Sequence, residues 1–394
     1  MEHPLSMDQR LAPTTTPAGK TRARGLGIPL PGTPGPANAI TDVDGVLVGY
    51  STLIKGDGGL SMGHGPVRTG VTAILPLGRD GVGVALAAGY HSFNGNGEMT
   101  GASWLEEAGS LSMPILITNT HAVGPCHRGV IDWVARNKPQ LASQWLLPVV
   151  AETWDGYLND INGSHVTVDH AIEAIDNAAG GGIEEGSVGG GTGMNCYAFK
   201  GGSGSASRIV DYGHRAYTVG VFLQANFGSR QEISIAGVPL GHELAADNPM
   251  EAYFSGGPTG AGSCIGIVAT DAPLLPGQCK ALARRVPLGL ARTGTAGSHF
   301  SGDIFLAFST ANGDALNGRF PKGAPSNESY SHMDFIPWGR MDDFYTAVVQ
   351  ATEEAVLNTL VANAEMVGRD GNRTPALPHA KVVAALKSRG VIAD

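Results

Sequence analysis

The stretch Gly262–Thr295, GSCIGIVATDAPLLPGQCKALARRVPLGLARTGT, is the most informative part of this sequence. Within it, Ser263–Thr270 is a short apolar run rich in β-branched residues, which predicts a buried strand. Asp271, followed two residues later by proline, supplies a cap and a start for a helix over Leu274–Leu290. A polar Gly-Ser step therefore lies at the very beginning of a core strand.

Strands and helices continue on both sides of this stretch. Upstream, three strand-like runs each lead through a loop into a helix-like segment: Val82–Ala88 before Ser103–Ala108, Pro114–Thr118 before Val130–Arg136, and Leu146–Ala151 before Val166–Ala178. Two further strands are expected at Met194–Phe199 and Tyr217–Asn226, separated by a loop at Gly201–Ser207, and a strand at Asp303–Ser309 precedes helices at Asp342–Asn363 and His379–Lys387. Strands and helices are mixed without strict alternation or an internal repeat. We therefore expect one α+β domain, a layered αββα structure over residues 25–394, after a flexible tail at residues 1–24.

The amino-acid composition limits the kinds of partner and compartment that we expect for this protein. The 394 residues include 26 basic and 35 acidic side chains, so the net charge is −9, which argues against nucleic acid or an anionic membrane as the main partner. No apolar run reaches the length of about 18 residues that a membrane helix needs, and the first residues lack the apolar core of a secretory signal. The four cysteines have no CxxC spacing. We expect a cytoplasmic protein in a reducing compartment.

Three local patterns resemble motifs of other chemistries, but each lacks a feature that its motif requires. Gly59–Gly63 matches G-x-S-x-G, but glycine-rich loop surrounds it where a nucleophile elbow needs a strand and a helix. Gly189–Gly193 does not complete a nucleotide-binding fingerprint. His121, Cys126 and His127 lack a fourth ligand for a closed zinc site and the H-E-x-x-H signature. We therefore expect neither a metal nor a cofactor.

The Gly262-Ser263 step has two interpretations. It is either a loop glycine before the first residue of a core strand, which is common, or a self-cleaving junction. In the second case the Ser263 hydroxyl attacks the Gly262 carbonyl, the acyl group moves from nitrogen to oxygen, and hydrolysis frees Ser263 as a new N-terminus. Glycine before the serine tolerates the strained backbone that such an attack needs.

The sequence resembles the DmpA-like family of L-aminopeptidase D-esterases and β-aminopeptidases, and this favours the junction. The stretch from Ser263 to Thr295 looks like the start of the family's small chain. Further blocks that carry the resemblance are Pro31–Ile54, Ala151–Gly163 (AETWDGYLNDING), Gly186–Arg208 (GSVGGGTGMNCYAFKGGSGSASR), Gln224–Arg230 (QANFGSR) and Ser298–Asn312 (SHFSGDIFLAFSTAN). Together the blocks extend over essentially the whole chain from about residue 25.

The resemblance implies a precursor that cuts itself before Ser263 into chains of residues 1–262 and 263–394, which stay together. It implies a four-layer αββα sandwich similar to N-terminal-nucleophile hydrolases, with a different strand connectivity that ornithine acetyltransferases share. It also implies a homotetramer of cleaved protomers that needs no metal.

The base that activates Ser263 stays open between two candidates. One is the α-amine freed by cleavage, since α-amines titrate near pH 8. The other comes from the resemblance, in which Ser301 and Asp303 form a triad with the nucleophile. Some relatives have glutamate where this chain has Asp303, so the carboxylate here is one methylene shorter. His299 is a runner-up to these two as the base.

The resemblance also supplies substrate contacts. It implies that the Asn226 amide stabilises the oxyanion, that Glu152 receives the free amino group of the substrate, and that Trp154 lines the pocket. The expected activity is hydrolysis of the amide or ester bond after an N-terminal L-, D- or β-amino residue, in small peptides, amides or esters with a free amine. The alternatives are an acyltransferase of the ornithine acetyltransferase type, an unprocessed binding relative and a metalloaminopeptidase; a serine nucleophile argues against the first and the histidine spacing against the last.

Overall fold

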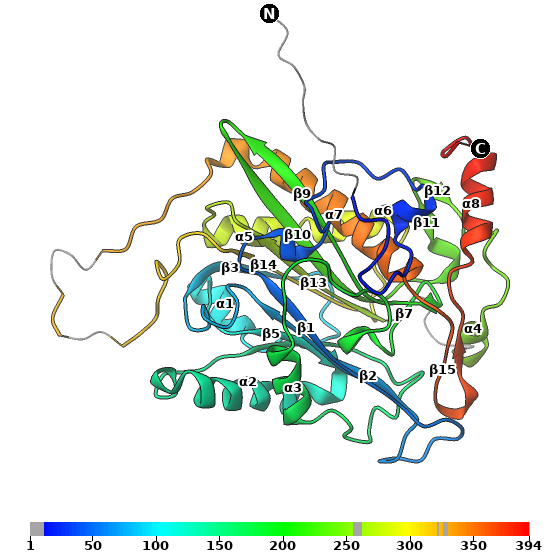
Figure 1. Ribbon diagram of the computed structural model, residues 1–394, viewed down its shortest axis with the longest axis horizontal. Helices are drawn as coiled ribbons and strands as arrows, with labels where there is room; N and C mark the ends of the chain where they lie inside the picture. The colour runs from blue at the N-terminus through cyan, green and yellow to red at the C-terminus, as the bar shows by residue number, and fades with distance from the viewer. Residues whose placement is uncertain (1–11, 255–261, 321–322, 326–329, 394) are drawn as a thin grey trace, which may run out of the picture.

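The chain folds into four layers, helices–sheet–sheet–helices, which Figure 1 shows from the side. This computed structural model describes residues 12–254, 262–320, 323–325 and 330–393. The expected αββα sandwich of the α+β class is confirmed. Within the described residues, no helix is long and apolar enough to cross a membrane.

The upper sheet has six strands and contains the Ser263 strand near its centre. Its strands, in spatial order, are β4 (Ser110–Leu111), β3 (Leu86–Ser92), β14 (Gly302–Ser309), β13 (Ser263–Thr270), β10 (Arg215–Asn226) and β9 (Gly202–Tyr212). The β13–β14 pair is parallel, and the other neighbours are antiparallel. Strands far apart in the chain therefore meet around β13.

The lower sheet has four strands and ends at the edge strand that carries Glu152. Its order is β1 (Leu47–Lys55), β2 (Val67–Leu75), β5 (Ile115–Asn119) and β6 (Val149–Thr153), with β5 and β6 parallel. Apolar side chains of both sheets, such as Ile117 and Ile267, pack against each other and form the central core.

Helices cover the two outer faces. The upper sheet packs against α5 (Pro276–Ala283), α6 (Val286–Arg292) and α7 (Asp342–Val361), and the lower sheet against α2 (Val123–Asn137) and α3 (Val168–Asp176). The remaining helices and short strands are α1 (Ala102–Ala108), α4 (Pro249–Tyr253), α8 (His379–Ser388), β7 (Asn195–Cys196), β8 (Phe199–Lys200), β11 (Ser234–Ile235), β12 (Val238–Pro239), β15 (Met366–Val367) and β16 (Arg373–Thr374). Each sheet thus has one face on the central core and one on a helical layer.

Three sequence predictions were wrong in detail. The loop expected at Gly201–Ser207 belongs to β9, a buried strand of small residues. The strand expected at Met194–Phe199 is a tight hairpin, because Tyr197 and Ala198 both take positive φ angles and reverse the chain. The helix expected over Leu274–Leu290 is divided into α5 and α6, since a proline near the start of α6 cannot continue a helix.

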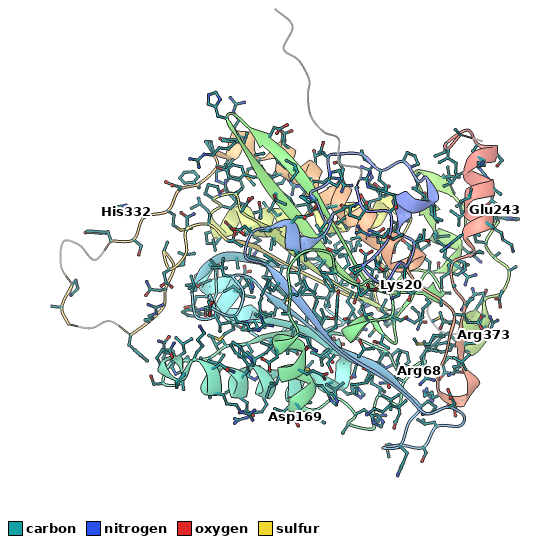
Figure 2. The ribbon with its side chains drawn as sticks, in the orientation of Figure 1. Lys20, Arg68, Asp169, Glu243, His332 and Arg373 are labelled. Carbon is teal, nitrogen blue, oxygen red and sulfur yellow. The ribbon has the colours of Figure 1, made fainter. Side chains whose placement is uncertain are left out.

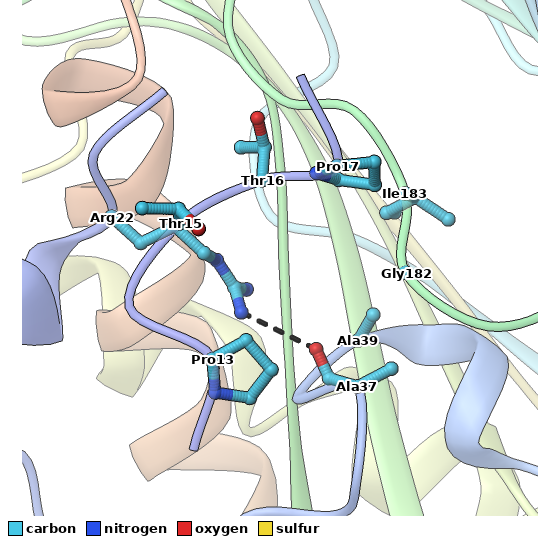
Figure 3. Close-up of a pocket in the computed structure, with 9 residues that line it drawn as sticks. All are labelled: Pro13, Thr15, Thr16, Pro17, Arg22, Ala37, Ala39, Gly182 and Ile183. Carbon is cyan, nitrogen blue, oxygen red and sulfur yellow. Dashed lines mark hydrogen bonds between the residues drawn. The ribbon is translucent and has the colours of Figure 1, made fainter. Parts of the chain in front are cut away.

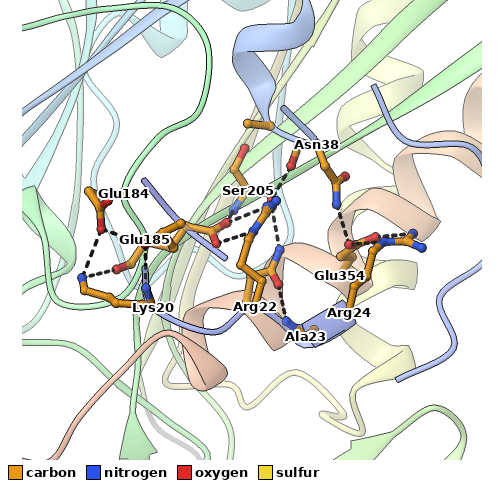
Figure 4. A network of polar contacts seen from close by, with 12 residues as sticks. Lys20, Arg22, Ala23, Arg24, Asn38, Glu184, Glu185, Ser205 and Glu354 are labelled. Carbon is orange, nitrogen blue, oxygen red and sulfur yellow. Dashed lines mark hydrogen bonds and ion pairs between the residues drawn. The ribbon is translucent and has the colours of Figure 1, made fainter. Parts of the chain in front are cut away.

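The N-terminal segment from residue 12 is packed on the body, unlike the flexible tail expected over residues 1–24; residues 1–11 lie outside the described residues. Arg22 is buried and forms an ion pair with Glu185, its Nε donating to a carboxylate oxygen at 2.8 Å, and Arg24 pairs with Glu354 on α7 (Figure 4). Ala23 is fully buried beside them. Basic residues that suggested a solvated tail therefore bind buried carboxylates.

Two further arginines, both labelled in Figure 2, attach the C-terminal segment to the body. Arg68 at the start of β2 donates to the Val367 carbonyl at 2.9 Å and pairs with Asp57. Arg373 forms ion pairs with Asp247 and Glu365. The part of the chain after α7 is thereby held against the end of the lower sheet.

Candidate active site

Ser263 is the first residue of β13 and lies in the sheet between two partners. It pairs with Asn226 of β10 on one side and with Gly302 of β14 on the other. Its side chain is buried, and no described group hydrogen-bonds its Oγ. A buried hydroxyl without a hydrogen-bond partner is unusual, and it marks this position as a candidate functional group.

The Gly262 carbonyl, which precedes Ser263, is held by the backbone of β14. The Gly302 N–H donates to this oxygen at 3.0 Å. A Cβ at residue 262 would lie 2.0 Å from the Asn226 carbonyl oxygen, so only glycine fits. The carbonyl beside Ser263 is therefore both fixed and polarised by a hydrogen-bond donor.

Ser301 and Asp303 form a pair, but the uncut chain does not connect them to Ser263. Ser301 Oγ donates to Asp303 Oδ1 at 2.6 Å. Burial raises the pKa of Asp303, opposed by the hydrogen bonds from Ser301 and Asn94. Side chains alternate along a strand, so Ser263 faces the central core while Cys264 and its register partner Asp303 face the helical layer. No hydrogen bond joins the pair to the Ser263 hydroxyl among the described residues.

Asn226 lies on the same face as Ser263, at the end of β10. Its Oδ1 accepts the Asn195 N–H at 2.9 Å, and its Nδ2 donates to the Trp154 carbonyl at 3.0 Å. An amide nitrogen has two hydrogens, so the second N–H of Asn226 has no partner among the described residues. The amide orientation is set by Asn195, which in turn accepts the Thr374 hydroxyl at 2.6 Å.

Glu152 is buried on the edge strand β6 of the lower sheet. Its Oε1 accepts the Glu98 N–H at 2.8 Å and its Oε2 accepts the Thr120 hydroxyl. Burial raises the pKa of Glu152, and these two hydrogen bonds oppose the rise. Trp154, two residues on, is 38% exposed and packs edge-to-face on Phe254, with ring centroids 6.4 Å apart. The carboxylate is thus buried, whereas the indole is partly exposed.

Sequence reasoning did not single out the residues that hold these groups. Asn94, Glu98 and Thr120 contact Asp303 or Glu152, and Asn195 contacts Asn226. The only signal was the run Asn94-Gly-Asn-Gly97 directly after an apolar run, which is also a common loop composition.

In the described ranges, neither His299 nor His121 forms a hydrogen bond with Ser263, Ser301 or Asp303. His299 is exposed and packs against Phe300, with ring centroids 5.2 Å apart. His121 bonds the Asn162 side chain at 2.8 Å, whereas Cys126 is buried in α2, where burial raises the pKa of its thiol to about 12. In the part of the chain that the structure describes, no three His, Cys, Asp or Glu side chains are grouped as metal ligands.

A separate pocket of about 210 Å³ lies under the N-terminal segment (Figure 3). It is lined by Pro13, Thr15, Thr16, Pro17, Arg22, Ala37, Ala39, Gly182 and Ile183. The Arg22 guanidinium is already bound to Glu185 and to the carbonyls of Ala37, Asn38 and Ser205. No group that lines it belongs to the site around Ser263.

Comparison with known proteins defines the class of this site. The chain is 42% identical to the L-aminopeptidase D-Ala-esterase/amidase of Ochrobactrum anthropi, described as a serine aminopeptidase with a variant of the Ntn hydrolase fold; the TM-score is 0.86 and the match covers 94% of this chain and 99% of that one. The β-aminopeptidase of a Burkholderia species gives 41% identity and a TM-score of 0.83 over 94% and 99% of the two chains. The fold is that of a serine aminopeptidase.

The family follows from the sequence matches. Residues 38–374 match peptidase family S58. The β-peptidyl aminopeptidase BapA of Sphingosinicella microcystinivorans is 48% identical over 93% of this chain and 92% of its own, and that of Sphingosinicella xenopeptidilytica is 44% identical over 96% and 94%. The chain belongs to peptidase family S58, it is a hydrolase of the serine aminopeptidase type, and the resemblance found in the sequence is confirmed.

Proposed function

We propose that this enzyme cuts itself between Gly262 and Ser263 and then uses Ser263 as an N-terminal nucleophile. The observation that carries the proposal is the Gly302 N–H bound to the Gly262 carbonyl at 3.0 Å, directly beside the buried Ser263 hydroxyl without a partner. In the cleavage step, Ser263 Oγ adds to the Gly262 carbonyl carbon while the Gly302 N–H stabilises the oxygen that becomes negative. The C–N bond then breaks and the amine leaves with a proton. Water hydrolyses the resulting ester, which gives residues 1–262 and 263–394.

In each later turnover the same hydroxyl attacks the substrate carbonyl. The free N–H of Asn226 is available to the developing oxyanion, and an amide donor in such a position is worth roughly 3–4 kcal/mol. Glu152 binds the protonated amine of the substrate, which limits the enzyme to free N-termini, and Trp154 borders the pocket. The product is the released N-terminal residue, after water hydrolyses the acyl-enzyme.

Two groups remain candidates for the base that activates the Ser263 hydroxyl. The new α-amine of Ser263 is attached to the nucleophile itself, and cleavage also frees the residue to rotate toward Ser301 and Asp303. In the uncut chain that pair is formed but faces the other side of the strand. A rotation after cleavage would complete the relay.

The substrates that we propose are small peptides, amides and esters with a free amine, including those with an N-terminal β-amino residue. The support is the identity of 48% and 44% to two β-peptidyl aminopeptidases over more than nine-tenths of this chain. We further propose that cleaved protomers assemble as a homotetramer in the cytoplasm, on the family resemblance and the composition alone.

Mass spectrometry of the purified protein tests the proposal. The wild type should give two fragments that end at Gly262 and begin at Ser263, and Ser263→Ala should give one intact, inactive chain. Ser203→Ala, at a buried serine of β9 away from the junction, is the matched control and should still be cut. An uncut wild type with full aminopeptidase activity would refute the N-terminal nucleophile.

A further inference from the structure

One short segment, Asn94–Thr100, crosses the site from the upper sheet to the lower one. It follows β3, which pairs with β14 in the upper sheet. At its other end Met99 bridges Ala151 of β6, and the Thr100 N–H donates to the Val150 carbonyl at 2.9 Å. The segment therefore touches both halves of the site.

The first half of the segment is attached to the start of β14 and to the loop that precedes this strand. The Asn94 Nδ2 donates to Asp303 Oδ2 at 3.0 Å and to the Ser298 carbonyl at 3.0 Å. The Asn96 Nδ2 donates to the Phe300 carbonyl at 2.9 Å. These bonds fix the segment relative to the strand that pairs with Ser263.

Its second half is attached to the carboxylate proposed to bind the amine. The Glu98 N–H donates to Glu152 Oε1 at 2.8 Å. The Thr100 hydroxyl donates to the Pro148 carbonyl at 2.7 Å and accepts the Val150 N–H at 2.9 Å. The segment thus holds β6 and Glu152 through backbone contacts that do not depend on substrate.

Gly97 occupies the point where the two halves meet. A Cβ built there would lie 3.1 Å from Gly302 Cα and 3.3 Å from Glu152 Oε1. Gly302 is the register partner of Ser263. The bare backbone of Gly97 therefore lets Glu152 approach the start of β14, beside the register partner of Ser263, as closely as it does.

We propose that Asn94–Thr100 is a spacer that sets the distance from Glu152 to Ser263, and that Gly97 thereby determines the preference between α- and β-amino residues. The inference rests on the proposed function of Glu152. In a β-residue the amine is one carbon–carbon bond, about 1.5 Å, further from the attacked carbonyl. Misplacement by about 1 Å can lower a rate about 100-fold, so the spacing discriminates between the two substrate classes. Gly97 is a positioning residue, since it acts through Glu152.

Gly97→Ala tests the spacer, measured as kcat/KM for β-alanyl and L-alanyl p-nitroanilide. The added methyl group meets the backbone of Gly302 on one side and the flexible end of Glu152 on the other, so we expect the carboxylate to move away from Gly302, the register partner of Ser263. We expect the ratio of β to α activity to rise roughly threefold or more. Gly95→Ala is the matched control, because a Cβ there meets nothing within 4 Å, and it should keep the wild-type ratio.

Each other outcome contradicts the spacer. Equal loss of both activities in Gly97→Ala would show a merely structural role, and equal kcat/KM of the wild type on the two substrates would exclude a fixed spacing. If Gly97→Ala does not fold, Thr100→Val replaces it, because valine keeps the shape of threonine and loses both hydrogen bonds of the hydroxyl. The ratio of β to α activity should then move toward one, and an unchanged ratio would overturn the proposal. A wild type that hydrolyses neither substrate would refute the proposed function as well, which distinguishes the two failures.

Discussion

Replacing Glu152 by glutamine tests whether the buried carboxylate binds the free amine of the substrate. Glu98 N–H and the Thr120 hydroxyl donate to its two oxygens. A glutamine has the same shape; its carbonyl oxygen can accept the Glu98 N–H, and its NH₂ group can donate to the Thr120 oxygen, because a hydroxyl accepts as well as donates. Both protein contacts therefore survive, and only the negative charge is lost.

The effects on activity and on folding should have opposite signs. Loss of a charge-assisted hydrogen bond to the substrate ammonium costs about 1.5–3 kcal/mol, which is about 10- to 100-fold in kcat/KM. Burial raises the pKa of Glu152 above its ordinary value, so the folded state disfavours the charged form and loses stability as the pH rises above the unfolded pKa. At pH 7 Glu152→Gln should therefore unfold at the same temperature as the wild type or at a higher one.

The assay compares an aminoacyl p-nitroanilide with its N-acetylated form, for the wild type and the variant, together with thermal unfolding. Glu107→Gln, at an exposed carboxylate of α1, is the matched control and should leave kcat/KM unchanged. Self-cleavage needs no external amine and should proceed in Glu152→Gln. Equal rates of the wild type on the two substrates, or an unchanged kcat/KM in the variant, would refute the role of Glu152.

Three further predictions concern Asp303, His299 and the buried ion pair between Arg208 and Glu354. Asp303→Asn should keep the fold and lower kcat about 100-fold or more, and a kcat equal to that of the wild type would exclude the carboxylate as an activator. Because burial raises the pKa of Asp303, the acidic limb of the wild-type pH profile should lie above the ordinary pKa of an aspartate. His299→Ala should leave kcat/KM nearly unchanged, because the ring is exposed, and loss of turnover would make the imidazole the base. Glu354→Ala leaves Arg208 buried without its carboxylate, so urea unfolding should show a loss of about 3–5 kcal/mol, and an unchanged stability would contradict the importance of this pair.

The strands that were predictable from sequence are those with continuous apolar runs. Ser263–Thr270 and Asp303–Ser309 are buried on both faces and appear as short runs of apolar residues. Strand β9 shows why the pattern fails elsewhere. A Cβ at Gly204 would lie 2.2 Å from the Ala355 carbonyl of α7, and the Ser205 hydroxyl is bonded to the Val221 carbonyl at 2.6 Å. Close packing on a helix requires small residues there, and their composition is that of a loop.

The resemblance to a known family named candidate site residues, but it did not supply their geometry. Family resemblance named Ser263 and Asn226, but their contact depends on the register between β10 and β13, which local sequence does not encode. The register between β13 and β14 separates Ser263 from Asp303: Asp303 pairs with Cys264, and neighbouring positions on a strand face opposite sides. Long-range pairing therefore decides both which residues meet and which do not.

The segment Asn94–Thr100 also contributes hydrogen bonds that oppose the rise in pKa of two buried carboxyl groups. Burial raises the pKa of both Asp303 and Glu152, which alone would favour protonation of each. Asn94 donates to Asp303 and the Glu98 N–H donates to Glu152, and hydrogen bonds to a carboxylate favour its ionised form. A single segment thus contacts both the carboxyl group proposed to activate Ser263, in the upper sheet, and the one proposed to bind the amine, in the lower sheet. Displacement of this segment would weaken both groups together, so spacing and charge in this site depend on the same few backbone and amide contacts.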